Sequence, residues 1–564
     1  MPARTSLGAL SLVLSLGPAA RGGWAPDPSP PAQELAGGVH KDARFGYKIR
    51  PPKDWLPIPV QIDEGWLIAK YLSDRAYFYT DPVEGYTYEF KPEMMVIAFI
   101  HDVVKKKEPD VREEGDTKVV TWVNRYKDYE DYLDQTYSGG GFYVAAKEKV
   151  KWHGVDVTQM EIKVEKLTRS GPKRIVTWIF HVPKVDIAVH IEVLEDSYKK
   201  LKSTVDRTLS SFQVIERTAP LPTEQASTAG LVVTFVGEWS QQDKTPAERR
   251  AARIQHQESI HQRTIDSLPV GWTHAKIGRF LVVTSADEKY AKKLANQAEC
   301  VWSWLEETFP YVGPGEYVRE PILRICKTQD EEMSYTRGGG SSWAGMGLEF
   351  ITNRETGGAL SFEYEWINRR MLDHWFQDRD RDLYWAMPEW LQYGLRALVG
   401  NSSAKGSKLR FYADLWNKDD LREIVQRGAA RSPRDIVQMT RSEFWGEGGR
   451  SVWDSLYQSE AFAYFLMAGD GARNPDYQGF ISGYLDKLKG VLEERAAAEK
   501  ADPSSAGEEA PATEEEEEER YRRRRERLRE DEEAFVDEVF RRAFPSWTES
   551  DWERIGREYL KSIS

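Results

Sequence analysis

The chain has 564 residues, of which 40% are hydrophobic and 12% aromatic, and its formal net charge is −13. This length exceeds what one hydrophobic core usually organises, so we expect two or more globular domains. An acidic chain with no broad excess of Lys and Arg is a poor match for the phosphate backbone, so nucleic acid is not expected as a partner.

The first 25 residues have the pattern of a secretory signal peptide. Arg4 provides a basic start, residues 7–16 are apolar, and small residues precede a Gly-Trp-Ala sequence. The apolar stretch is too short to cross a bilayer, and no later window offers the roughly 20 apolar residues of a membrane helix. We therefore expect a secreted or periplasmic protein without a membrane span.

Residues 26–44, rich in Pro and then Gly, are expected to form a flexible lead-in, and residues 45–216 a first domain. The domain contains apolar, β-branched or alternating segments that predict strands. These segments are Trp66–Tyr71, Met94–Ile100, Lys118–Val123, Val157–Val164, Ile175–Val182 and Ile187–Val193. The spacing of Leu201, Val205 and Leu209 predicts a closing helix over 198–212 that packs on the sheet.

Two segments of this first domain carry a family resemblance. The sequence Phe45-Gly-Tyr-Lys-Ile-Arg-Pro-Pro-Lys-Asp-Trp55 and the helix ending Leu209-Ser-Ser-Phe212 resemble those of PsbP-like domains. That resemblance implies an α/β sandwich used for binding, and hence a non-catalytic module. A generic α+β domain, the alternative, leads to the same functional expectation.

Residues 217–269 are expected to be a linker with one strand, Leu231–Val236, and a charged helix, 246–268. The second domain, 270–492, begins with predicted strands at Phe280–Thr284 and Ile322–Ile325. Between them, Ser285-Ala-Asp-Glu288 predicts a capping box that opens a helix.

The rest of the second domain, to Lys489, is predicted to be helical. The Gly338–Trp343 loop lacks the Gly-Lys-Ser/Thr ending of a phosphate loop and is expected to be a turn. Residues 493–533 form a charged, low-complexity insertion, and residues 534–564 are expected to form amphipathic helices that pack back on the second domain. The predicted fold class is α+β, with an antiparallel N-terminal sheet domain followed by a mainly helical domain that begins with a small sheet.

The two cysteines, Cys300 and Cys326, allow two interpretations. In an oxidising compartment they could form a disulfide, whereas buried free thiols are the alternative.

The chemistry-bearing pattern is a pair of predicted helices in the second domain. Asp373-His-Trp-Phe-Gln-Asp378, followed by Pro388-Glu-Trp-Leu-Gln-Tyr-Gly-Leu395, resembles the active-site helices of gluzincins, and especially the peptidase-MA-like domains of bacterial exported proteins. Those families have His-Glu-x-x-His and then Pro-x-Trp-Leu-x-Glu-Gly-Leu. The segments Tyr457–Leu466 and Ala543–Trp547 also resemble that family, which implies a zinc peptidase fold across residues 270–564.

The chain departs from this pattern at three of four positions. His374 matches the first zinc ligand, but Trp375 stands at the general base, Asp378 at the second ligand and Tyr393 at the third. An indole cannot take a proton from water at neutral pH, so peptidase activity should be absent and no zinc cofactor is expected. We therefore expect no catalytic residues.

Two questions, each with two possible answers, remain open at this stage. A residual metal site would use His374, Asp378 and Glu389, whereas His374 and Asp378 four residues apart also suit a hydrogen-bonded pair. The large rings of Trp375, Trp385, Trp390 and Tyr393 either fill the former cleft or line a recess for a peptide or sugar.

The main functional hypothesis is an exported non-catalytic protein that binds or scaffolds a protein, peptide or saccharide partner. The alternatives are a divergent metal-dependent hydrolase, and an interaction protein that acts through the 493–533 insertion.

Overall fold

The computed structural model describes most of the chain after residue 32. The described residues are 33–36, 38–61, 67–83, 85–101, 110–114, 117–121, 126–137, 139, 141–165, 171–218, 221, 231–235, 245–310, 319–336, 349–355, 364–412, 418–446, 451–501, 523 and 531–563. The signal-peptide segment and the Gly338–Trp343 loop lie outside them. No helix in these ranges is long and apolar enough to cross a membrane.

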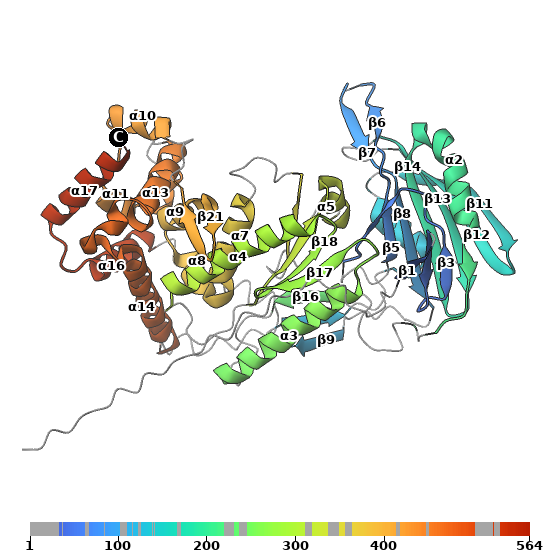
Figure 1. Cartoon of the computed structure of the whole chain (residues 1–564), viewed down its shortest axis with the longest axis horizontal. Coiled ribbons are helices and arrows are strands. Elements are labelled where there is room, and N and C mark those ends of the chain that lie inside the picture. Colours follow the sequence, from blue (N-terminus) through green and yellow to red (C-terminus); the bar gives the residue numbers. More distant parts are fainter. Residues whose placement is uncertain are drawn as a thin grey trace, which may run out of the picture.

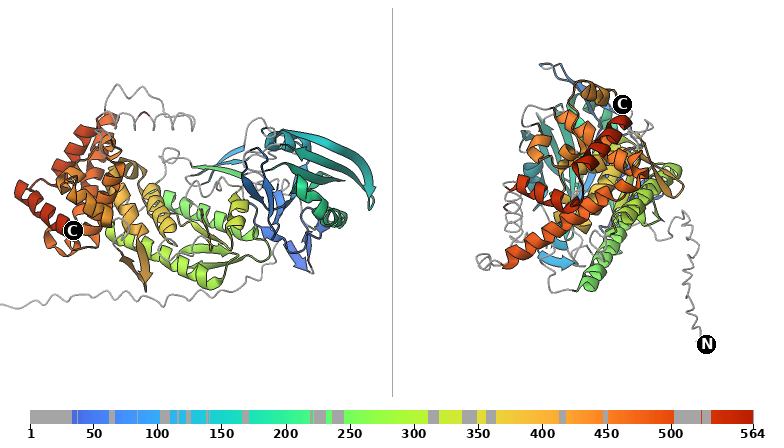
Figure 2. Two further views of the ribbon diagram at one scale, coloured as in Figure 1. Left: turned by 90° about the horizontal axis from the view of Figure 1, so that it is seen from above. Right: turned by 90° about the vertical axis from the view of Figure 1, so that its left-hand side faces the viewer.

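The fold class is α+β, as predicted from the sequence. Figure 1 shows a large antiparallel sheet at one end of the molecule, a small mixed sheet in the middle and a group of helices at the other end. Figure 2 shows the same order along the long axis in a perpendicular view.

The first unit is built on a seven-stranded sheet in which every neighbouring pair is antiparallel. In spatial order its strands are β11 (Phe142–Trp152), β12 (Val155–Val164), β13 (Lys173–Val182), β14 (Val185–Leu194), β8 (Glu93–Ile100), β5 (Leu67–Leu72) and β4 (Leu56–Ile58).

Both faces of this sheet are covered at its central strands. Helix α2 (Glu195–Ser210) packs against β13 and β14, and helix α1 (Tyr129–Tyr137) covers the opposite face. Consecutive residues of β8 therefore alternate between two cores, with Met94 and Val96 in one and Met95 and Ile97 in the other. Burial on both faces explains why the strand is an unbroken apolar run.

A four-stranded sheet and a two-stranded sheet are formed by the other strands around the large sheet. Strands β1 (Gln33–Ala36), β2 (Val39–Asp42), β3 (Tyr47–Ile49) and β15 (Gln213–Val214) form a second sheet, and β6 (Tyr77–Thr80) pairs with β7 (Thr87–Phe90). The predicted flexible lead-in, 26–44, therefore contains two paired strands, because the backbone of β2 finds partners in both β1 and β3.

The predicted strand at Lys118–Val123 is not part of the large sheet. It forms β10 (Thr117–Thr121), which lies between β9 (Asp110–Glu114) and β16 (Leu231–Phe235) in a three-stranded sheet. The strand expected in the linker is thus a pairing partner of a strand from the first domain. The local sequence pattern predicts that these residues form a strand, but it does not predict which other strand they pair with.

The charged helix predicted in the linker is α3 (Pro246–Asp266), which begins with a capping box formed by Thr245 and Glu248. It packs onto the second unit, with Ile260 only 1% exposed and Gln257 donating to Glu320 over 3.1 Å. It is therefore an integral element of that unit and not a spacer.

The second unit begins with a mixed sheet in the order β17 (Thr273–Ile277), β18 (Phe280–Thr284), β19 (Ile322–Cys326) and β20 (Glu349–Asn353). The first pair is antiparallel and the other two are parallel. Helix α4 (Glu288–Thr308) follows β18, but its N-cap is Asp287, whose side chain accepts from the Tyr290 N–H. The predicted cap at Ser285 is wrong, because its hydroxyl bonds Glu331 on helix α5 (Gln329–Thr336).

The remainder of the second unit is mostly but not wholly helical, because β20 and a hairpin interrupt it. Its elements are α7 (Glu365–Arg379), α8 (Arg381–Ala386), α9 (Glu389–Gly400), the hairpin β21 (Ser402–Lys405) and β22 (Lys408–Phe411), α10 (Lys418–Gln426), α11 (Pro433–Val437), α12 (Arg441–Phe444), α13 (Val452–Met467), α14 (Phe480–Ala501), α16 (Glu532–Ala543) and α17 (Glu549–Ile563), with 3-10 turns at Gly471–Arg473 and Pro475–Tyr477.

Helix α14 corrects the start of the predicted insertion. It continues to Ala501, so residues 493–501 are helical, and most of the remaining insertion lies outside the described residues. The C-terminal helices pack on this unit, with Phe535, Val539 and Ile555 in the same core as residues of α7 and α9.

Candidate functional site

Helices α7 and α9 carry the residues predicted for the site, and both are held by contacts along their buried faces. The side chain of Asn368 on α7 is fully buried, donates to the Val399 carbonyl on α9 and accepts from Gln297 on α4. On the far side of α9, Gly394 faces α13, where an added Cβ would lie 2.8 Å from the Ser459 carbonyl oxygen. The glycine of the gluzincin-like pattern therefore has a packing reason here.

His374 lies inside the protein between two aromatic rings. Its ring centroid is 6.1 Å from that of Trp302 on α4 and 5.7 Å from that of Phe350 on β20, and the residue is 6% exposed. Its Nε2 is 2.5 Å from the main-chain carbonyl oxygen of Arg319. A carbonyl only accepts, so Nε2 carries the proton and donates it.

The protonation state of the His374 ring decides which of its nitrogens keeps a lone pair for a metal ion. Burial lowers the pKa of this imidazole, an effect only partly opposed by the Asp378 carboxylate, so the ring is neutral at pH 7 with its single proton on Nε2. A zinc ligand needs a nitrogen lone pair, and Nε2 offers none in this arrangement.

Asp378, one helical turn further along α7, is bound by two arginines. Its Oδ2 accepts from the Arg319 N–H over 2.8 Å, and its Oδ1 accepts from Nε of the same arginine over 2.9 Å and from its Nη2. Arg253 of α3 places Nη1 3.6 Å from Oδ2. Although burial alone would raise it, these two guanidinium groups hold the pKa of Asp378 well below its usual range.

The structure therefore joins His374 and Asp378 through Arg319. The Arg319 carbonyl accepts from His374, the Arg319 guanidinium donates to Asp378, and the positive charges of Arg319 and Arg253 both face the Asp378 carboxylate. Neither arginine could be found from the sequence, because Arg253 and Arg319 lie 125 and 59 residues away from Asp378 and no local pattern marks them.

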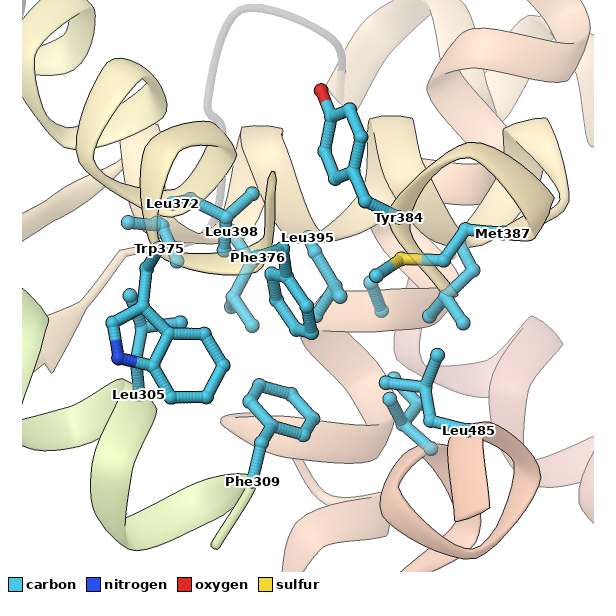
Figure 3. Close-up of a cluster of buried hydrophobic side chains, with 14 of the residues drawn as sticks. Leu305, Phe309, Leu372, Trp375, Phe376, Tyr384, Met387, Leu395, Leu398 and Leu485 are labelled. Carbon is cyan, nitrogen blue, oxygen red and sulfur yellow. The ribbon is translucent and has the colours of Figure 1, made fainter. Parts of the chain in front are cut away.

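Trp375, which the gluzincin resemblance would align with the general base, is completely buried. Figure 3 shows its indole among Leu305, Phe309 and Phe376, and the ring centroids of Trp375 and Phe376 are 5.0 Å apart. The Arg379 guanidinium lies 4.9 Å from its ring centroid. The indole is a part of the hydrophobic core that joins α4 to α7.

The other aromatic residues are divided between core and surface. Trp390 is also fully buried, whereas Trp385 is 42% exposed. Tyr393, at the third-ligand position, is half-buried and stacks on Phe444 of α12 at a centroid distance of 5.4 Å. The rings of Trp375 and Trp390 thus fill the space at the helix pair, while Trp385 and Tyr393 lie toward its outside.

The third candidate for a metal ligand, Glu389, has a different partner. Its Oε1 lies 2.9 Å from Nη2 of Arg441 on α12. The nearby Asp373 is bound in turn by Arg396, over 2.7 Å to Nε, and by the Tyr384 hydroxyl over 3.0 Å. Among the described residues, no three His, Cys, Asp or Glu side chains are arranged to hold a metal ion.

The two cysteines are not paired with each other. Both Cys300 on α4 and Cys326 on β19 are buried free thiols, and burial raises the pKa of each. The Cys300 Sγ lies 3.7 Å from the Gly406 carbonyl oxygen.

A buried polar contact also joins the two units. Lys70 on β5 is 3% exposed, and its Nζ donates to the Ser334 carbonyl on α5 over 2.6 Å. The Ser334 hydroxyl donates to Glu93 on β8 over 2.9 Å, and the Gln61 amide donates to the Tyr335 carbonyl over 2.5 Å. Apolar side chains from both units form one buried cluster that also contains Tyr335, among them Ile58, Leu72, Leu281, Val283 and Ile351.

Comparison with known proteins identifies no family. No family model and no curated protein matches the chain. Among solved structures, the cyanobacterial PsbP (CyanoP) from Synechocystis sp. PCC 6803 is 15% identical with a TM-score of 0.21, covering 31% of this chain and 91% of that one. LpqN, involved in cell envelope biogenesis of Mycobacterium tuberculosis, is 11% identical with a TM-score of 0.18, covering 30% and 83%.

Proposed function

We propose that this chain is an exported, non-catalytic protein with a binding or scaffolding role, in which residues 270–564 are a degenerate gluzincin-like domain. The observation that carries the proposal is the arrangement around Arg319. This residue accepts the Nε2 proton of His374 and binds the Asp378 carboxylate, so the two best-placed candidate ligands serve as internal structural contacts.

The general-base position supports the same conclusion. A metallopeptidase needs a carboxylate there to take a proton from the metal-bound water. Trp375 offers no acceptor and its ring is enclosed by core side chains, so there is neither a base nor space for the water. The ion pair of Glu389 with Arg441 likewise gives that carboxylate a structural role on the α12 side of α9.

The proposed location and the role of the first unit rest on sequence. The pattern of residues 1–25 favours export, and the segment Phe45–Trp55 favours a PsbP-like binding module. The buried Lys70–Ser334 contact favours a scaffold in which this module is held firmly against the second unit.

Metal content and peptide cleavage test the proposal together. The full chain, purified in the presence of zinc and then desalted, should contain far less than one zinc per molecule by mass spectrometry. A broad peptide library should show no cleavage that depends on His374. His374→Gln is the variant of choice, because a glutamine amide can still donate to the Arg319 carbonyl while the imidazole is removed.

Stoichiometric zinc together with a cleavage activity that His374→Gln abolishes would overturn the proposal. A matched control is His153→Asn on the surface of the first unit, which should leave both measurements unchanged.

A further inference from the structure

A separate cavity lies where α9, α10, α13 and α17 meet, and its lining includes none of His374, Trp375, Asp378 and Tyr393. Figure 1 shows these helices together in the C-terminal helical group. The cavity has a volume of about 280 Å³, just below the range of typical small-molecule sites. Its wall includes Asn401, Tyr412, Tyr457, Glu460 and Tyr464.

Helix α13 contributes Tyr457, Glu460, Ala461, Tyr464 and Phe465 to this wall. Tyr457, Glu460 and Tyr464 are three and four residues apart and share a helix face. The opposite face of α13 packs on α9 through Ser459 and Ala463, which are fully buried. Tyr457 and Tyr464 on the cavity side are only partly buried and pack against the edge of the same core.

The same face continues beyond the cavity to an exposed tryptophan. Trp453, one turn before Tyr457, is 63% exposed, and the two ring centroids are 6.0 Å apart with an interplanar angle of 32°. A tryptophan so accessible to water gains little from core packing. Its ring extends the aromatic wall of the cavity outward over the surface.

Polar groups are fixed beside these rings. Asn401, at the end of α9, donates from Nδ2 to Oε1 of Glu460 over 3.2 Å, which orients the carboxylate at the wall. The Tyr412 hydroxyl is held 2.9 Å from the Ser403 hydroxyl. The wall thus combines flat apolar faces with several donors and acceptors.

The charges of the lining balance. Lys418 and Arg473 are positive, and Glu460 and Asp470 are negative, so the formal sum is zero. This balance favours a neutral ligand over an anion or an organic cation. A molecule with an apolar face and many hydroxyl groups matches both the rings and the polar side chains.

We propose that this cavity is a saccharide-binding site. One pyranose ring would enter the cavity with its C–H face on Tyr457 and its hydroxyls toward Glu460 and Asn401, and the next residue of an oligosaccharide would lie on Trp453. The inference deepens the proposed binding role by naming a site and a ligand class, and it does not depend on the state of the helix pair at His374.

Ligand-observed saturation-transfer NMR and calorimetry on the full chain test the site. The probes are β-1,4-linked hexamers of glucose and of N-acetylglucosamine and an α-1,4-linked hexamer of glucose, with tetramethylammonium as the cationic comparison. At least one hexamer should bind, and Tyr457→Ala and Glu460→Gln should each weaken it by at least about tenfold. Trp453→Ala should weaken the hexamer but have little effect on the corresponding monosaccharide.

Trp366→Ala is the matched control, because Trp366 is 47% exposed on α7 and is not part of the cavity wall. Failure of all three hexamers to bind would overturn the inference, as would binding that Tyr457→Ala, Glu460→Gln and Trp453→Ala all leave unchanged, or tetramethylammonium binding in place of sugar. Those failures would leave the zinc and peptide-cleavage results unaffected, so the two proposals can fail separately.

Discussion

Arg319 donates to both carboxylate oxygens of Asp378, from its main-chain N–H to Oδ2 and from its guanidinium to Oδ1. Both side chains are nearly inaccessible to water, at 2% and 3% exposure. Arg253 adds a second positive charge at 3.6 Å. The site at the helix pair is thus an internal ionic contact that ties α3 and the segment before β19 to α7.

Removing the acid should be strongly destabilising. In Asp378→Ala, the buried guanidinium groups of Arg319 and Arg253 lose the carboxylate that faces them, and we expect the unfolding free energy to fall by about 3–5 kcal/mol. Denaturant titration measures the change. The control is Glu553→Ala, which breaks an exposed pair with Arg557 and should cost less than about 1 kcal/mol. Equal effects of the two substitutions would show that Asp378 is not held as described.

The contact between the two units gives a second prediction. Lys70→Met removes the buried bond to the Ser334 carbonyl and leaves that oxygen and the Glu93 carboxylate without this partner. The expected cost is about 1–3 kcal/mol, concentrated at the interface, so the region between the units should become more sensitive to limited proteolysis. Lys202→Met, at an exposed pair with Asp206, should not change the cleavage rate.

The buried histidine of β2 should make stability depend on pH. Burial, partly opposed by Asp42, lowers the pKa of His40 to about 4, whereas the unfolded value is near 6.5. Between these values the unfolded chain binds a proton that the folded chain does not, so stability is complete above pH 6.5 and is lost as the pH falls toward 4.

Because the pKa of His40 falls from 6.5 to about 4 on folding, the free energy of unfolding should change by about 3 kcal/mol between these pH values. His40→Gln cannot titrate, so its unfolding free energy should fall less between pH 6.5 and 4 than that of the parent. Urea titrations at several pH values measure the slope for both. His153→Asn, at an exposed histidine, should keep the parental slope. Parallel curves for His40→Gln and the parent would contradict the prediction.

The cysteines provide a chemical test of the alternatives left open by the sequence. Both thiols are buried and burial raises the pKa of each, so neither should react quickly with a thiol reagent in the native protein. After unfolding without reductant, two thiols per chain should be titrated. A count of zero in denaturant would mean that Cys300 and Cys326 form a disulfide instead.

The strands that sequence analysis identified and those it missed differ in their surroundings. Strands β8 and β14 lie inside the sheet with both faces buried, which gives them long apolar runs. Strand β11 was missed because it is the edge of the sheet and nearly all of its residues are exposed, including Lys147, Glu148 and Lys149. Charged side chains are common on edges, where they discourage pairing with other chains.

In the candidate site too, the sequence predicted a local relationship but not the contacts between distant segments. The spacing of His374 and Asp378 placed them on one face of a helix, and they do lie together in the structure. Their connection through Arg319 depends on a contact between distant segments, and a buried arginine has no local sequence signature. The same limit applies to Glu389, whose partner Arg441 is on another helix.

Two tryptophans near helices α7 and α9 allow the stability cost of a core substitution to be compared with that of a surface substitution. Trp375 on α7 is fully buried, whereas Trp385 on α8 is 42% exposed and contacts Tyr384 edge-on. Trp375→Ala should cost about 3–5 kcal/mol, because the truncation leaves a cavity between α4 and α7. Trp385→Ala should cost less than about 1 kcal/mol, as is usual for a surface substitution. If Trp375→Ala were as stable as Trp385→Ala, the indole would not be part of the packed core, and the proposed non-catalytic function would lose the support that it takes from this packing.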